Sequence, residues 1–219
     1  MITVGIPVLN RYDLLPKAIE SAMNGTLKPD EILIVDNGNR INEMQWTPPP
    51  NMVVTIYRPG FNTGVASAWN YIITHTKEHR VLINDDLQFL PDSLEKLIHA
   101  MEEGAEWACI CRPYGMVNGF SCQVISDACI QKVGLFDELI SPNYAYHEDD
   151  DFAYRMRLAG IEGVDCGAEA IHATSSTLKA FSPQEQMEHH KKFALAQSNY
   201  IKKWGGMPLQ EKFTVPYGG

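Results

Sequence analysis

The strongest constraint on the fold of this chain is the alternation of short apolar runs with segments of helical periodicity in its first half. The pattern predicts elements in this order: strand 2–9, helix 14–23, strand 31–35, strand 53–57, helix 65–76 and strand 80–83. The run Ile-Leu-Ile-Val at 32–35 is apolar on both faces, which is typical of a parallel sheet covered by helices. We therefore expect an α/β fold whose ligand site lies beyond the carboxyl ends of the strands.

The remaining segments extend this pattern with less regularity. Helices are predicted at 91–103, 148–158 and 183–204, a strand at 105–111 and a proline-rich loop at 47–51. In the first helix, Asp13 is the expected N-cap and Gly25 the expected left-handed stop. An irregular tail rich in Gly and Pro follows the last helix.

The composition narrows the classes of partner. The 219 residues include 18 basic and 27 acidic side chains, a formal net charge of −9 at pH 7 that repels nucleic acid and anionic membrane surfaces. No run approaches the ~20 apolar residues of a membrane span, and no basic segment precedes the apolar run at the N-terminus. We therefore expect a cytoplasmic protein that binds no nucleic acid and does not span a membrane.

The cysteines point to a reducing compartment. They are five, an odd number, and most lie in apolar segments: Cys109, Cys111, Cys122, Cys129 and Cys166. We expect them to be reduced core residues. A structural zinc site is disfavoured, because Cys109 and Cys111 fall within a predicted strand and lack the usual spacing of zinc ligands.

A first acidic motif directly follows the predicted strand 80–83. It consists of Asn84, Asp85 and Asp86, which are expected at the carboxyl edge of the sheet. Adjacent carboxylates repel each other, and a divalent cation with a bound diphosphate would compensate that repulsion. The plainer alternative is that the pair ends the strand and caps a turn.

A second acidic motif spans residues 147–155. If a helix starts near Glu148, Asp151 and Arg155 are four residues apart and can pair, while Asp149 stays in the first turn and faces the sheet edge. The helix dipole favours the ionised form of Asp149, whereas neighbouring acids raise its pKa. Such a carboxylate can act as a general base. The alternative is an acidic helix N-terminus that serves only as a cap.

His172 follows the strand-like segment 169–171. A lone histidine there is usually structural, but beside an acidic site it becomes a candidate metal ligand, and imidazole with carboxylate suits Mn²⁺ better than Mg²⁺. Three motifs are missing from the sequence: a Gly-x-Gly-x-x-Gly after the first strand, a Walker motif and a Gly-x-Ser-x-Gly elbow. Dinucleotide-binding enzymes, P-loop NTPases and α/β-hydrolases are therefore disfavoured.

Taken in order, the motifs resemble those of the inverting glycosyltransferases of family 2, which have the GT-A fold. The segments that carry the resemblance are 4–11, 32–38, 62–70, 84–86, 133–138, 148–155 and 200–206. The resemblance implies a central, mostly parallel mixed sheet flanked by helices in a single domain, residues 1–219. Its parts would be a nucleotide-binding half at 1–110, an acceptor and catalytic half at 111–180, and a C-terminal helix and tail at 181–219.

The resemblance also implies roles for individual residues. Contacts to a nucleotide sugar would be made by Pro7, Val8, Leu9, Asn10, Asp36, Asn37, Gly64, Asn70, Asn84, Asp85 and Asp86. Asp86 and His172 would hold Mn²⁺ or Mg²⁺. Asp149 would be the catalytic base, with Glu148 as its nearest competitor. The sequence departs from the family pattern at Asn37 and at Asn84, where aspartate is common.

The implied reaction moves a sugar from a nucleoside-diphosphate sugar, with UDP as the expected nucleotide, to a hydroxyl of a glycan or another acceptor. Phe120, Tyr144 and Tyr146 suit stacking on a sugar, although an ordinary packing role is favoured for them. Two alternatives stay open. One is a catalytically silent subunit that binds nucleotide sugars within a glycan-assembly complex, which loss of Asp149 or Asp86 would signal. The other is a nucleotidyltransferase, which would need a Gly-rich, Arg-containing loop after the first strand.

Overall fold

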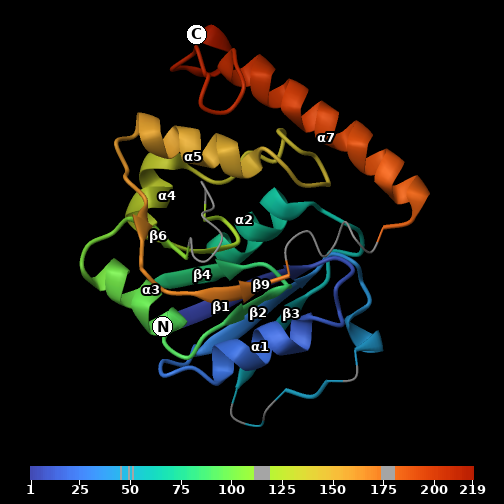
Figure 1. Cartoon of the computed structure of the whole chain (residues 1–219), viewed down its shortest axis with the longest axis vertical. Coiled ribbons are helices and arrows are strands. Elements are labelled where there is room, and N and C mark those ends of the chain that lie inside the picture. Colours follow the sequence, from blue (N-terminus) through green and yellow to red (C-terminus); the bar gives the residue numbers. More distant parts are fainter. Residues whose placement is uncertain (45, 49, 51, 111–118, 174–180) are drawn as a thin grey trace.

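The computed structural model describes residues 1–44, 46–48, 50, 52–110, 119–173 and 181–219 (Figure 1). The strands are β1 (Ile2–Val8), β2 (Glu31–Asp36), β3 (Val53–Tyr57), β4 (His79–Ile83), β5 (Leu87–Phe89), β6 (Trp107–Cys109), β7 (Cys122–Ile125), β8 (Val164–Asp165) and β9 (Ala170–His172). The helices are α1 (Leu15–Met23), α2 (Val65–His75), α3 (Ser93–Glu102), α4 (Asp127–Val133), α5 (Glu148–Leu158) and α7 (Pro183–Trp204), with short 3-10 turns η1 (Ile41–Glu43) and η2 (Pro216–Gly218).

A seven-stranded sheet in the order β3-β2-β1-β4-β7-β6-β8 forms the centre of the molecule. β1 is parallel to β2 and β4, β2 is parallel to β3, and β7 runs antiparallel to both β4 and β6. β5 and β9 form a separate two-stranded antiparallel sheet. The predicted α/β class with a mostly parallel mixed sheet is confirmed.

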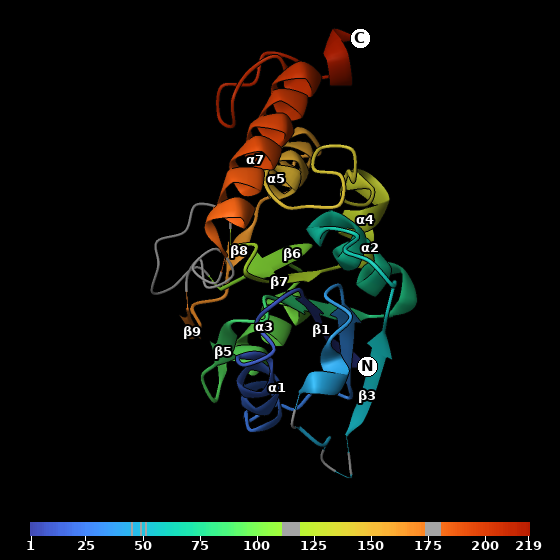
Figure 2. The same cartoon turned by 90° about the vertical axis from the view of Figure 1, so that its right-hand side faces the viewer.

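Two apolar clusters cover opposite faces of this sheet, because side chains alternate along each strand. Ile6 of β1 belongs to the cluster with α1 and α3, and Leu82 of β4 to the cluster with α2 and α5. A Cβ at Gly5 would lie 2.4 Å from Ile72 Cγ2, so only glycine lets α2 pack this closely on β1. Figures 1 and 2 both place α7 beyond α5, at the end of the molecule opposite α1.

Several element boundaries differ from the sequence prediction. The first helix begins after Leu14, and the Asp13 carboxylate instead pairs with Arg11 at 2.7 Å. Gly25 does not end the helix in a left-handed conformation, since Asn24 is the C-cap with φ −96°. A Cβ at Gly25 would lie 3.0 Å from the Pro91 carbonyl oxygen, so close packing requires the small residue. The predicted N-cap and stop are therefore both wrong.

The sequence prediction missed β7 and α4 altogether and overextended the strand at 105–111. β7 has only four residues and carries Gln123 at its centre, whose Oε1 accepts from the Trp107 indole at 2.7 Å. A polar residue within so short a strand interrupts the run of apolar residues by which a buried strand is recognised in a sequence. The part of the predicted strand after residue 110 lies outside the described residues. Cys109, Cys122, Cys129 and Cys166 are free thiols, as predicted.

Within the described residues, no helix is long and apolar enough to cross a membrane. The tail after α7 folds back on that helix. There the Trp204 carbonyl accepts hydrogen bonds from the amides of Lys212 and Phe213 at 2.9 and 3.0 Å. The Tyr154 hydroxyl on α5 donates to the Phe213 carbonyl at 2.8 Å. The tail is thus attached to both α5 and α7.

Candidate active site

The site begins where β1 and β2 end side by side. Pro7 is in register with Val35 and Val8 with Asp36, and the Asn37 amide donates to the Val8 carbonyl at 2.9 Å. Leu9 and Asn10 continue past this edge. A Cβ at Gly38 would lie 2.0 Å from the Leu9 carbonyl oxygen, so the two loops can meet only with glycine at this position. The sequence analysis did not single out Gly38, although an Asn-Gly pair after a strand signals a tight turn.

Asp36 is wholly buried beneath these loops. Its carboxylate accepts from the Tyr12 hydroxyl, from the Arg40 amide at 3.3 Å and from the Ile41 amide at 3.1 Å. Arg58 Nε lies 3.8 Å from its Oδ2. The carboxylate therefore holds the turn into η1, and its contact with a nucleotide stays a prediction.

Asn37 links β2 to the start of α2. Its Oδ1 accepts from the Thr63 hydroxyl at 2.9 Å and its Nδ2 donates to the Gly64 carbonyl at 3.3 Å. Gly64 has φ +86°, and a Cβ there would lie 2.6 Å from backbone atoms of Tyr144. The Val65 amide donates to the Tyr144 carbonyl at 2.7 Å. These contacts bring the segment ahead of α5 to the sheet edge.

Asn70 lies one turn further along α2 and is buried. Its Nδ2 donates to the Phe136 carbonyl and to Glu138 Oε1, both at 2.9 Å, and its Oδ1 accepts from the Phe136 amide at 2.9 Å. Both amide hydrogens of Asn70 are thus engaged within the protein. In the structure, Asn70 holds residues 136–138 against α2, and the nucleotide-sugar contact expected of it stays a prediction.

The Asn84-Asp85-Asp86 motif follows β4 at the same edge. The Asn84 amide donates to the Ser121 carbonyl at 3.0 Å. Asp85 is nearly buried, and burial together with the neighbouring Asp86 raises its pKa to about 8, while Arg11 and the Leu9 amide act in the opposite direction. The loop after β1 therefore reaches the end of β4.

The structure brings together Asp86 and His172, the two residues that the family resemblance implies as metal ligands, and their binding of a metal stays a prediction. Pairing of β5 with β9 sets Leu87 opposite His172, and His172 Nε2 lies 2.9 Å from Asp86 Oδ1. Both side chains are only 7% exposed. No group of three His, Cys, Asp or Glu side chains suited to a metal ion occurs in the part of the chain that the structure describes. Two protein ligands fit a cation that completes its shell with diphosphate oxygens and water.

The segment ahead of α5 has an unusual backbone. Asn143, Tyr146 and His147 all have positive φ, at 56°, 92° and 65°. Non-glycine residues seldom adopt this region, and such strain concentrates at functional sites. Contacts with α7 hold this segment in place: the Tyr144 hydroxyl lies 2.9 Å from His189 Nδ1, and the Tyr146 ring packs on the Phe193 ring.

Glu148 and Asp149 open α5; Glu148 is buried and Asp149 is half-buried. Burial and the adjacent Asp149 raise the pKa of Glu148 well above its ordinary value, and Glu148 Oε2 has no hydrogen-bond partner among the described residues. Burial and the nearby Asp150 raise the pKa of Asp149 to about 6. His147 Nδ1 lies 2.8 Å from Asp150 Oδ2. The first turn thus holds two carboxyl groups that take up protons more readily than ordinary acids.

Asp151, two residues on, has a different environment. The predicted pair with Arg155 is present, with Arg155 Nε 2.8 Å from Asp151 Oδ2. The other oxygen, Oδ1, accepts from Lys203 Nζ at 2.6 Å and from the Trp204 indole at 2.8 Å. Lys203 also contacts Asp137 at 2.7 Å. This buried network, which joins α5 to α7, was missed, because spacing alone does not show that a distant Lys-Trp pair meets an acid.

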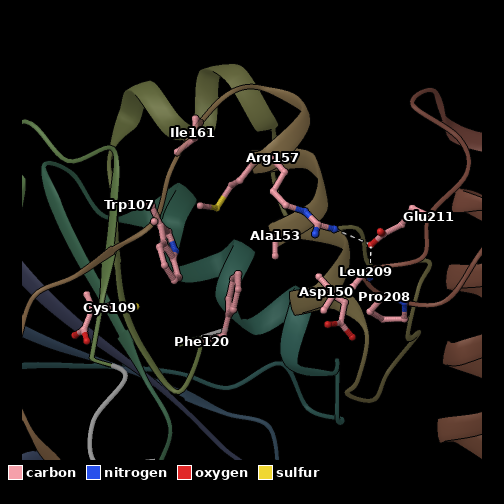
Figure 3. A pocket seen from close by; sticks show the side chains of 13 residues that line it. Trp107, Cys109, Phe120, Asp150, Ala153, Arg157, Ile161, Pro208, Leu209 and Glu211 are labelled. Atoms are coloured by element: carbon pink, nitrogen blue, oxygen red, sulfur yellow. Dashed lines mark hydrogen bonds and ion pairs between the residues drawn. The ribbon is translucent and has the colours of Figure 1, made fainter. Parts of the chain in front are cut away.

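Phe120 does not offer a face for a sugar. Its ring is 4% exposed and lies within an aromatic cluster whose neighbours are Trp69, Trp107, Phe136 and Phe152. The favoured packing role is therefore the one the structure shows. A cavity of about 390 Å³ lies next to this cluster, between α5, β6 and the C-terminal tail (Figure 3).

The chain matches a known family over most of its length. The model of the family described as Glycosyl transferase family 2 matches residues 3–159. No curated protein sequence matches the chain significantly.

Two similar solved structures share the fold. One is the mannosyltransferase PcManGT from Pyrobaculum calidifontis in complex with GDP-Man and Mn²⁺, with a TM-score of 0.66, 14% identity, and coverage of 95% of this chain and 66% of that one. The other is TarS 1-349 from S. aureus in complex with UDP-GlcNAc, with a TM-score of 0.62, 14% identity, and coverage of 90% and 66%. The present chain thus spans just under two thirds of each, and at this identity the likeness shows the GT-A fold.

Proposed function

The chain belongs to glycosyltransferase family 2, and from that premise we propose that it transfers a sugar from a nucleoside-diphosphate sugar, UDP-linked by preference, to an acceptor hydroxyl with inversion. One observation carries the proposal. Asp149 lies half-buried in the first turn of α5, and partial desolvation with the nearby Asp150 raises its pKa to about 6. A carboxylate with this pKa is ionised at neutral pH and accepts a proton more readily than an ordinary aspartate.

The donor would bind along the carboxyl edge of the sheet. The loops after β1 and β2 meet there through Gly38, and Asp85 faces them from the end of β4. Carboxylates at such an edge accept hydrogen bonds from ribose hydroxyls. Two similar solved structures hold nucleotide sugars, GDP-Man in one and UDP-GlcNAc in the other, which supports a donor of this class here.

Asp86 and His172 would hold a divalent cation, Mn²⁺ or Mg²⁺. Their oxygen and nitrogen atoms lie 2.9 Å apart in a buried setting, and this mixed donor set suits Mn²⁺. When bound, the cation supplies Lewis-acid stabilisation of the negative charge on the departing diphosphate. Arg11, whose guanidinium lies near Asp85 and Asp86, adds positive charge on the same side.

Asp149 would take the proton of the acceptor hydroxyl. As the oxygen attacks the anomeric carbon, a carbon–oxygen bond forms on one face and the bond to the diphosphate oxygen breaks on the opposite face. The leaving electron pair goes to the diphosphate and the proton to Asp149. Glu148 is the competing base, and burial together with the adjacent Asp149 raises its pKa well above the ordinary carboxyl value.

We treat residues 1–219 as one functional unit in this proposal, with donor contacts in 1–110 and the base and acceptor contacts in 111–180. The alternative of a silent binding subunit predicts nucleotide binding without turnover. Both Asp149 and Asp86 are present, which favours the enzyme.

A thermal-shift panel is the first test. UDP, GDP, dTDP and CMP are each added with and without Mn²⁺, because a ligand that binds only the folded state raises the melting temperature. We expect a metal-dependent rise with one nucleoside diphosphate, and loss of the metal dependence in Asp86→Ala. Absence of any shift in a folded sample would contradict the proposal.

A further inference from the structure

His147 is the residue on which α5 begins, and it has no role in the reaction described so far. It is the N-cap of the helix, with φ +65° and ψ −4°, and its carbonyl accepts from the Asp151 amide at 3.0 Å. The residue is only 8% exposed, although it directly precedes Glu148 and Asp149. Because a non-glycine residue is strained in this conformation, surrounding contacts must fix it, and the His147 ring supplies them.

The His147 ring is held by α7, the C-terminal helix that lies beyond α5 (Figures 1 and 2). The centroid of the ring lies 5.3 Å from that of Phe193 and 5.7 Å from that of Tyr200. Tyr200 is wholly buried, and its hydroxyl donates to Glu211 Oε1 at 2.5 Å. Phe193 and Tyr200 are about two helical turns apart on one face of α7, so that face sets the orientation of the histidine ring.

The same ring binds Asp150. His147 Nδ1 lies 2.8 Å from Asp150 Oδ2, and in the part of the chain that the structure describes no other side chain pairs with this carboxylate. The Asp150 amide donates to Asp149 Oδ1 at 2.9 Å. Asp150 therefore connects the ring that α7 fixes to the candidate base.

The negative charge on Asp150 acts on Asp149. Desolvation of Asp149 and then the charge on Asp150 raise the pKa of Asp149 to about 6, whereas His147 acts in the opposite direction. A hydrogen-bond donor at His147 Nδ1 offsets part of the charge on Asp150, and a cation there offsets more of it. Other titratable groups next to this turn are Tyr146, Glu148 and Asp151 on the same segment, His189, Tyr200 and Lys203 on α7, and Glu211 in the tail.

We propose that His147 is a positioning residue for Asp149: its ring, oriented by α7, binds the Asp150 carboxylate and limits the negative charge that Asp149 meets. This inference deepens the proposed function and rests on it, because Asp149 is taken as the base of the transfer. It also gives the C-terminal helix a part in the reaction, through the two rings that fix His147.

The test follows the protonation of Asp149 directly and needs no turnover. The side-chain carboxyl carbons of the isotope-labelled full chain are observed by NMR as the pH is varied, and the Asp149 signal is assigned by its absence from Asp149→Asn. His147→Phe keeps an aromatic ring against α7 but has no group that binds Asp150. His147→Asn restores a donor on a residue that tolerates positive φ, and Asp150→Asn removes the charge itself.

We expect the titration midpoint of Asp149 to rise by about half a pH unit in His147→Phe, a roughly threefold increase in proton affinity. The midpoint should return towards the wild-type value in His147→Asn and fall below that value in Asp150→Asn. The double variant His147→Phe/Asp150→Asn should match Asp150→Asn, because a residue that acts through Asp150 has no further effect once the charge is gone.

His99→Phe on α3 is the matched control, because the His99 side chain is 66% exposed, lies next to Glu102 and Glu103, and should leave the midpoint unchanged. Should His147→Phe fail to fold, His147→Gly replaces it, since glycine adopts positive φ without strain. An unchanged Asp149 midpoint in the folded His147 variant would show a merely structural residue and overturn the proposal. A rise of the midpoint in Asp150→Asn, or additive shifts in the double variant, would overturn it as well.

Turnover by the same variants separates this proposal from the previous one. The acid limb of the pH profile of kcat/KM should move to higher pH in His147→Phe, because the base must be ionised to act. A raised NMR midpoint without turnover in any sample would contradict the transferase and leave the effect of His147 on Asp149 standing. Turnover with an unmoved midpoint would do the reverse.

Discussion

The turn after β2 and the first turn of α5 both bury carboxylates, but in opposite environments. Asp36 accepts hydrogen bonds from a tyrosine hydroxyl and two backbone amides, and a guanidinium lies nearby. Glu148 and Asp149 lie among other acids, behind a backbone with positive φ, and burial raises the pKa of both. The comparison indicates that a carboxylate surrounded by hydrogen-bond donors supports the loops of the site, whereas a carboxylate with acidic neighbours and a raised pKa can take up a proton.

The largest effect is expected from Asp149→Asn. This variant keeps the shape of the side chain but cannot accept a proton, so turnover should fall by about 10²–10⁴-fold, the usual contribution of a general base. The measurement is release of the nucleoside diphosphate, with nucleotide binding followed by thermal shift. Asp92→Asn at the start of α3 is the control, because its carboxylate is 49% exposed and pairs with the exposed Lys96. Full turnover in Asp149→Asn would assign the base elsewhere, with Glu148→Gln as the next variant.

Asp151 lies only two residues after Asp149, and Asp151→Ala tests whether its carboxylate stabilises the fold. Its removal deprives Arg155, Lys203 and the Trp204 indole of their shared buried acceptor. Breaking a buried ion pair from one side costs about 3–5 kcal/mol, which urea unfolding would detect. Asp92→Ala removes a solvent-exposed pair with Lys96, and the free energy of unfolding should fall far less than in Asp151→Ala. Similar losses in the two variants would contradict a special role for the network between α5 and α7.

The pH dependence of kcat/KM reports on Asp149 in the free enzyme. Its pKa is raised to about 6, and the base must be ionised to act. Activity should therefore be constant above this value and fall about tenfold per pH unit below it. A profile that stays flat down to pH 4 would show that the acting base has an ordinary carboxyl pKa.

Tyr12→Phe should have the smallest effect and removes one hydrogen bond from Asp36. A hydrogen bond from a neutral donor to a charged acceptor contributes about 1.5–3 kcal/mol. The loss should be smaller here, because the amides of Arg40 and Ile41 still donate to Asp36. The loss should be seen in unfolding free energy, with the pH profile of turnover unchanged. Tyr217→Phe, at a residue that is 60% exposed, is the control. A changed pH profile of turnover in Tyr12→Phe would contradict the distinction between the turn after β2, which is structural, and the first turn of α5, which takes up the proton.

Much of the first half of the fold could be read from the sequence. The strands β1 to β4 and the helices α1 and α2 are long enough for their apolar periods to appear, and each predicted bound differs from the observed one by at most one residue. The strand β7 and helix α4 were missed, because segments of only four and seven residues are too short to show a clear apolar period. The family resemblance likewise followed from short motifs in the right order.

Local periodicity and the order of the motifs were enough to predict the class of fold, the family and which acids follow which elements. The environment of each acid depended on the tertiary structure. Asp149 and Asp151 are alike in sequence, yet one lies among other acids and the other meets Lys203 and Trp204 from α7. Burial and partners distant in the chain set the pKa of a carboxyl group, and neither is encoded in the spacing of the residues around it.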